Sequence, residues 1–232
     1  IVGGATVFDP DSADFAGGRL EVAITSGGTA SDRLLIREGN GISLAGDTVI
    51  YDSGGPRLIG SLTIDGWLLT VHFTTLDASQ EAAQALLRSV AYENVSDNPS
   101  TDKRRIQISL SDGDGGHQTR TVTQTVTVQP VNDPPLAEPD AYSTVSGQKL
   151  VLSRSQGVLA NDRDPEGTAF FARLVAEPTA GALTLNADGS LTYQPDPLSF
   201  GPDYFWYEAW DGQAASAPVR VSIEVRPKPT NP

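Results

Sequence analysis

Alternating apolar and polar residues recur along the whole chain, and clusters of Gly, Asn, Asp and Pro separate the alternating runs. About seven short strands with a turn in each gap are typical of an Ig-like sandwich. The second half carries that number, since one run begins near Tyr142 and six others predict strands over residues 149–152, 170–175, 182–185, 190–194, 204–210 and 219–225. The first half follows the same plan with more residues in the middle, so the pattern predicts an all-β chain.

One segment of the first half breaks the β pattern. The run DASQEAAQALLRSV, residues 77–90, has apolar residues at helical spacing, namely Ala82, Ala83, Leu86, Leu87 and Val90. Asp77 or Ser79 can cap the first turn. We expect a short helix that closes one end of a sandwich and contributes its apolar stripe to the core.

Internal similarity indicates two related units in tandem. The sequence Asp9-Pro10-Asp11-Ser12 matches Asp164-Pro165-Glu166-Gly167, and the strands that end in Asp-Gly at Asp112 and Asp211 each precede a long β-type run that ends in proline. Between the units, QPVNDPPLAEPD is rich in proline and acids, which predicts a stiff, extended linker. We predict one sandwich over residues 1–131, with an inserted hairpin and the short helix, a second over 132–226, and a linker to a further domain over 227–232.

Composition narrows the class of protein. The 232 residues are 38% hydrophobic and 19% charged, which suits a globular protein with a real core. No apolar run is long enough for membrane insertion. The sequence has no cysteine, so disulfides do not hold the fold, and no methionine even at position 1, so we expect a piece of a longer polypeptide. A formal net charge of −13 disfavours nucleic acid as a partner, and it serves either solubility or the binding of a divalent cation.

Two short motifs resemble a trypsin-like serine protease: the chain begins with IVGG, and Asp52-Ser53-Gly54-Gly55-Pro56 matches a nucleophile loop. A hydrolase also needs a histidine base. His72 alternates with apolar residues in a predicted strand, and His117 follows a Gly-rich loop with no serine partner. Because Asp-Ser-Gly-Gly between two alternating runs is hairpin chemistry, we interpret the motif as a turn and keep the serine hydrolase as a remote alternative.

The repeats carry a family resemblance. The motifs DAYST, GVLANDRDPEG, LNADGSLTYQP and YFWYEAWDG in the second unit, and DPDS, LLRSVAYENVSDNPS, LSDGDGG and VNDPP in and after the first, resemble cadherin-like tandem repeats of large bacterial surface and secreted proteins. The resemblance implies two cadherin-like sandwiches in an extracellular, calcium-binding, adhesion-type module that is strung in many copies. Its partners would be the neighbouring repeats.

The residues themselves also favour Ca²⁺. Calcium takes six to eight oxygen ligands and favours several carboxylates. In the second unit Asp162, Asp164 and Glu166 stand at every second position of one loop, Asp211 ends a strand, and Asn132 and Asp133 lie in the linker. In a sandwich these can meet at one tip, where unpaired carboxylates would repel each other. Ordinary turn chemistry is the alternative explanation for acids in these loops.

In the first unit the matching acids are Asp9, Asp11, Asp112 and Asp114. We expect a weaker or empty site there, because a preceding linker would have to supply part of its ligands.

An aromatic stripe suggests a second hypothesis. In DYFWYEAWDG, residues Tyr204, Trp206 and Trp210 alternate with the predicted core positions, where the resembling repeats carry small polar residues. Exposed rings suit sugar stacking and protein interfaces, although a loop or a neighbouring repeat could cover them. The leading hypothesis is therefore a non-enzymatic, calcium-rigidified spacer of an extracellular bacterial adhesion or matrix protein. The alternative is a module that binds a cell-surface glycan or protein through this stripe.

Overall fold

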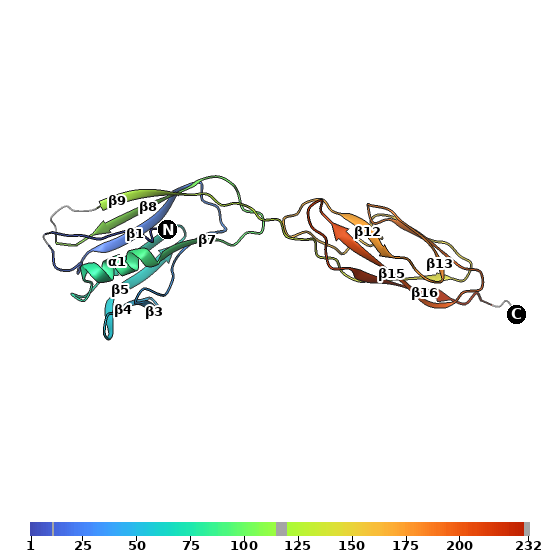
Figure 1. Cartoon of the computed structure of the whole chain (residues 1–232), viewed down its shortest axis with the longest axis horizontal. Coiled ribbons are helices and arrows are strands. Elements are labelled where there is room, and N and C mark those ends of the chain that lie inside the picture. The colour runs from blue at the N-terminus through green and yellow to red at the C-terminus, as the bar shows by residue number, and fades with distance from the viewer. Residues whose placement is uncertain (11, 115–119, 230–232) are drawn as a thin grey trace. The chain divides into compact units, whose positions relative to one another are not determined.

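The computed structural model describes residues 1–10, 12–114 and 120–229. The chain divides into two compact units, Ile1–Pro130 (unit 1) and Val131–Pro232 (unit 2) (Figure 1). Among the described residues, no helix has the length and apolar character needed to cross a membrane.

Unit 1 is built mainly from antiparallel strands. Its described elements are β1 (Arg19–Ser26), β2 (Asp32–Ile36), β3 (Ile42–Ala45), β4 (Thr48–Asp52), β5 (Pro56–Asp65), β6 (Leu68–Phe73), α1 (Gln80–Ser89), β7 (Val90–Asn94), β8 (Arg104–Ser111) and β9 (Arg120–Val126). A seven-stranded sheet has the order β3-β4-β5-β6-β1-β8-β9, and β2 pairs with β7 in a separate two-stranded sheet.

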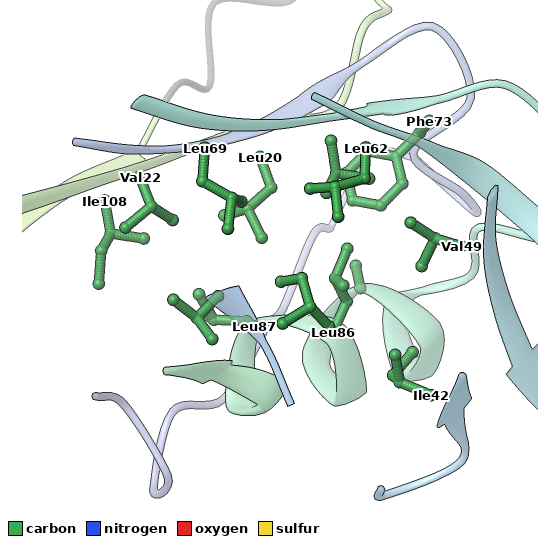
Figure 2. Packing of buried hydrophobic residues seen from close by; sticks show 14 of the residues in the cluster. Leu20, Val22, Ile42, Val49, Leu62, Leu69, Phe73, Leu86, Leu87 and Ile108 are labelled. Atoms are coloured by element: carbon green, nitrogen blue, oxygen red, sulfur yellow. The ribbon is translucent and has the colours of Figure 1, made fainter. Parts of the chain in front are cut away.

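The helix completes the core of unit 1. Ser79 caps it by accepting a hydrogen bond from the backbone N–H of Ala82, so the second of the two expected caps is the one used. Leu86 and Leu87 are buried against Leu20 and Leu69 of the large sheet (Figure 2). The predicted helix and its apolar stripe are confirmed. Its expected place is wrong, because α1 lies against the face of the sheet and forms part of the opposing layer instead of closing one end.

The Asp-Ser-Gly-Gly motif is a hairpin turn. It connects β4 to β5, and Asp52 pairs with Pro56 across the turn. The Asp52 side chain accepts hydrogen bonds from the N–H groups of Gly54 (3.1 Å) and Gly55 (2.9 Å), and both glycines have positive φ. Ser53 is therefore a turn residue, as the alternating runs on either side predicted. His72 lies exposed on β6 and His117 lies outside the described residues.

Unit 2 is a sandwich of two sheets. Its elements are β10 (Asp140–Val145), β11 (Leu150–Leu152), β12 (Phe171–Ala176), β13 (Gly181–Leu185), β14 (Leu191–Pro195), β15 (Gly201–Trp210) and β16 (Val219–Arg226). One sheet has the order β10-β16-β15-β12 and the other β11-β14-β13. The predicted strands are confirmed with ends shifted by a residue or a few. All pairs are antiparallel except β10 with β16, which is parallel.

The core of unit 2 depends on the alternation along β15 and β16. Phe205 and Tyr207 of β15 and Val221 and Ile223 of β16 are fully buried. The residues between them face outward, so each of these strands presents one apolar face to the core and one face to solvent. The β16 strand is held between β15 and β10. Of the predicted acids, Asp211 follows β15, Asp133 precedes β10, and those of the 162–167 loop precede β12.

Candidate metal site

Three segments of unit 2 that are far apart in sequence meet through side-chain hydrogen bonds. The amide of Asn132 donates to the Asp211 carboxylate (2.8 Å), and the N–H of Asp133 donates to the Glu166 carboxylate (3.1 Å). Leu136 and Arg163 add a pair of backbone hydrogen bonds. The segment before β10, the loop before β12 and the end of β15 therefore lie side by side, as predicted.

Backbone donors hold two acids at this tip, Asp211 and Asp164. Asp211 accepts from the N–H groups of Gln213 (2.6 Å) and Ala214 (2.7 Å), and these bonds, that from Ala214 foremost, together with the Asn132 amide lower the pKa of Asp211. Asp164 accepts from the N–H of Thr168 (2.9 Å). These hydrogen bonds fix the loops at the tip.

One carboxylate oxygen of Asp164 has no protein partner. Its Oδ2 is buried, and no described donor bonds it. A buried carboxylate oxygen without a hydrogen bond carries a desolvation penalty of about 1–3 kcal/mol or more. A cation bound to this oxygen would remove the penalty, so the donor set fits calcium chemistry.

The acids nevertheless do not form a closed cluster. Among the described residues, no group of three or more His, Asp or Glu side chains lies close enough to hold a metal ion. The contacts at the tip join one acid to one amide, as between Asn132 and Asp211. The side-chain nitrogen of Asn132 faces the Asp211 carboxylate, and the side-chain oxygen lies on the other side of the amide. For Asn132 to share a cation with Asp211, its amide would have to rotate so that the oxygen faces the carboxylate.

Asp162 makes different contacts from those of the other predicted ligands. It accepts from the Tyr207 hydroxyl (2.9 Å) and from the N–H of Glu138 (2.9 Å), and these contacts direct it toward the interior of the sandwich. Burial raises the pKa of Asp162, although both hydrogen bonds act against that rise. The expectation that every second side chain of the loop converges fails at this residue, because the Asp162 carboxylate bonds the Tyr207 hydroxyl and the Glu138 N–H instead.

Sequence reasoning missed a second polar cluster beside Asp162. Burial raises the pKa of Asp140, at the start of β10, to about 6, and the charge of Asp162 adds to this rise while a hydrogen bond from Tyr142 opposes it. Asp140 and Tyr142 both lie in the DAYST motif. This motif was used as part of the repeat, but the sequence did not predict that Asp140 lies near Asp162. Only the parallel pairing of β10 with β16 brings the motif there.

In unit 1 two of the predicted acids are buried. Asp112 is 3% exposed; its Oδ1 accepts from the N–H of Asp114 (3.3 Å), while its Oδ2 has no hydrogen-bond partner among the described residues. Asp9 accepts from the N–H of Ser12 (3.3 Å). Asp114 is exposed, and Asp11 lies outside the described residues. Asp112 therefore resembles Asp164, since each has a buried carboxylate oxygen without a hydrogen-bond donor among the described residues.

The segment around Asp112 is tightly packed against backbone. A Cβ atom on Gly18 would meet the carbonyl oxygen of Ser111 at 2.0 Å, so only glycine fits beside it. The carboxylate of Asp112 is thus buried by a close backbone approach.

The aromatic stripe lies on the outward face of the four-stranded sheet. Tyr204 is 48% exposed and Trp206 is 37% exposed. Trp210 is half-buried, because the guanidinium of Arg173 lies 3.9 Å from the centre of its ring. Two of the three predicted rings are accessible and the third is covered by an arginine of the same sheet.

Comparison with protein-family models gives a match to most of unit 2. Residues 132–227 match the model of the bacterial cadherin-like domain, and domains of this kind are typically extracellular. The chain is similar in structure to human mucin-like protocadherin EC1-2, with 16% identity, 85% of each chain covered and a TM-score of 0.38.

Two further similar structures are larger proteins. The human desmocollin-1 ectodomain shares 11% identity over 85% of this chain and 34% of its own, with a TM-score of 0.32. The endo-fucoidan hydrolase MfFcnA4 shares 14% identity over 93% of this chain and 28% of its own, also with a TM-score of 0.32. This chain thus spans about a third or less of either protein. No curated protein matches it.

Proposed function

We propose that the chain is a non-enzymatic, calcium-binding segment of a large extracellular bacterial adhesion or matrix protein. The observation that carries the proposal is the buried, unpaired Oδ2 of Asp164 in a tip where the segment before β10 is already bonded to Glu166 and Asp211. Asn132, Asp133, Asp164, Glu166 and Asp211 would hold the ion. Calcium supplies positive charge that several carboxylates can share.

The same contacts support a spacer role. Asn132 and Asp133 belong to the proline-rich segment that connects the two units in sequence. An ion shared by this segment and the 162–167 loop would restrict the segment, since releasing it would then require breaking the coordination. Asp162 would act as a positioning residue, because it holds the start of the loop on Tyr207 and Glu138. In unit 1, Asp9, Asp11, Asp112 and Asp114 would form a weaker site.

A calorimetric calcium titration of the 232-residue chain tests this proposal. Extracellular modules bind calcium at about 10⁻⁴ to 10⁻³ M, so we expect saturation in the low millimolar range. Asp164→Asn and Asp133→Ala should each weaken binding about tenfold or more. Asp188→Asn, which changes an exposed acid in the β13–β14 turn of the same unit, is the matched control and should leave binding unchanged. Equal affinity in all four proteins would show that the tip is an ordinary turn.

Exposure of the aromatic stripe favours a second function, the binding of a cell-surface glycan or protein. Tyr204 and Trp206 expose ring surface on the outward face of the sheet. The guanidinium of Arg220 lies 5.9 Å from the centre of the Tyr204 ring. Electrophoresis in gels that contain soluble polysaccharides tests the glycan form. We expect retardation that Trp206→Ala removes, and mobility that no polysaccharide changes would contradict it.

A further inference from the structure

The outer edge of β9 is open. This strand is the last of the large sheet of unit 1, and it pairs with β8 in an unbroken register from Leu110 opposite Arg120 to Arg104 opposite Val126. Among the described residues, no strand pairs with its other side. Every second N–H and C=O of β9 therefore points away from the sheet without a strand to bond it.

The corresponding edge in unit 2 is covered. The β15–β16 pair matches β8–β9, because each pair follows the same Asp-Gly signature and its second strand leads toward a proline. In unit 2 a further strand, β10, lies parallel to β16, from Asp140 opposite Val221 to Val145 opposite Arg226. Unit 2 thus shows what kind of element occupies this position.

The difference is visible in the burial of the core-facing side chains. In β16 these are Val221 at 0%, Ile223 at 0% and Val225 at 1% exposure. In β9, Val122 lies directly opposite the buried Ile108 and so faces the same core, yet it is 51% exposed. The rim of the unit 1 core is uncovered where β10 covers it in unit 2.

A mostly apolar groove of about 530 Å³ runs beside this rim, within the usual size range of ligand pockets. Its lining includes Val2, Val7, Phe8, Phe15, Leu110 and Val122. The N-terminal segment forms the opposite wall, but its hydrogen bonds to α1 run to the helix side. The N–H of Val7 donates to the Gln84 side-chain oxygen (3.2 Å), and Arg88 donates to the Ala5 carbonyl (2.7 Å). The segment flanks the groove and leaves the β9 edge unpaired.

Exposed strands are usually kept from pairing by lysine, proline, bulges, short length or inward-pointing charges, and β9 has one of these: Arg120 at its first position, which lies opposite Leu110 and lines the groove. Its sequence RTVTQTV has no lysine and no proline, and its register has no shift. From Arg120 to Val131 the sequence contains no acid, in a chain with a net charge of −13. The alternation continues through residues 127–129 after the strand ends, whereas β16 extends to the residue before its proline.

We propose that the β9 edge and the adjoining groove form a strand-acceptor site. Its occupant is an extended peptide with the alternating pattern of β10 that is supplied from outside residues 1–232 and runs parallel to β9, as β10 runs parallel to β16. Main-chain hydrogen bonds to β9 supply affinity, and apolar side chains at alternate positions enter the groove and cover Val122. Residues 127–129 would then join the strand. A second copy of this chain is a poorer occupant, because two β9 edges related by a two-fold axis would meet antiparallel.

Hydrogen exchange on the 232-residue chain tests the proposal. The probe is a synthetic peptide with the sequence of residues 137–146, AEPDAYSTVS, which contains the strand seen to pair in this way. At a tenfold excess of peptide over Kd, exchange of the outward-facing amides in residues 120–129 should slow about tenfold. The Val122→Lys variant places a charge in the groove and should abolish the effect. The control Thr123→Lys places the same charge on the solvent face of the same strand and should keep it.

Unchanged exchange at millimolar peptide would overturn the proposal, as would equal protection in the Val122→Lys variant. Protection of the same amides without peptide, in a chain that sediments as a dimer, would assign the edge to a second copy and also overturn it. None of these outcomes depends on calcium, so the test is independent of the proposed metal site.

Discussion

Single buried polar residues hold the loops of both units in place. In unit 1 Asp32 and Arg104 are fully buried and paired, with Nε and Oδ2 3.2 Å apart. Asp32 also accepts from the side chain of Asn94 (2.6 Å) and from the N–H of Thr29 (2.6 Å). In unit 2 Asp203 accepts from the N–H groups of Thr179 and Ala180 and thereby fixes the turn before β13. Buried charges of this kind are tolerated because they are paired and hydrogen-bonded.

Asp32 should make the stability of unit 1 depend on acid. Burial by itself raises the pKa of Asp32, but hydrogen bonds led by those from Tyr92 and Asn94 outweigh it and lower the pKa to about 2. A lowered pKa means that the stabilisation is complete above the unfolded pKa near 4 and is lost as the pH falls toward 2. A shift of this size corresponds to about 2 kcal/mol.

Urea unfolding of the wild type and of Asp32→Asn measures this contribution. The difference in unfolding free energy of unit 1 should be about 2 kcal/mol larger at pH 7 than at pH 2. Asp65→Asn, at the exposed end of β5, is the control and should show no such change. A difference between wild type and Asp32→Asn that is the same at both pH values would contradict the assigned pKa.

At the scale of elements, local pattern was sufficient wherever one face of an element meets the core. The strands of unit 2 and the helix α1 have a clear period, so their residues could be predicted. The position of α1 could not, because the stripe formed by Leu86 and Leu87 fits either an end or a face of the sheet. The large sheet leaves that face open, and α1 covers it (Figure 2).

The candidate site was predicted less completely than the strands. The spacing of Asp162, Asp164 and Glu166 indicated one shared site, whereas the structure turns Asp162 toward Tyr207. No local pattern shows that the hydroxyl of a tyrosine 45 residues away donates to this carboxylate. The contacts of Asn132 and Asp133 with the tip were predicted, because proline fixes an extended path for the segment and the strand order brings Asp211 to the same end. The open edge of β9 could be found only from the structure, because the sequence of a strand does not determine which strands pair with it.

At the scale of the whole molecule, charge connects the two units to a common chemistry. The net charge of −13 is concentrated in loops and linker, while the strands of both cores are largely apolar. Among the described residues, both units also contain a buried carboxylate oxygen without a hydrogen-bond donor, on Asp112 in unit 1 and on Asp164 in unit 2. A divalent cation would reduce repulsion in both places. The account therefore expects calcium to act on both units, and more strongly on unit 2, where Asn132 and Asp133 already contact the acids of the tip.

Thermal unfolding in calcium and in EDTA tests the central claim most directly. Binding to the folded tip alone adds RT ln(1 + [L]/Kd), which is about 1.4 kcal/mol at 10 mM calcium if Kd is about 1 mM. For a domain of this size, that should raise the midpoint of the unit 2 transition by about 5–10 °C. The unit 1 transition should shift less, and Asp164→Ala combined with Asp211→Ala should remove the unit 2 shift while both units still fold. Midpoints that are the same in 10 mM calcium and in EDTA would contradict the calcium-binding account.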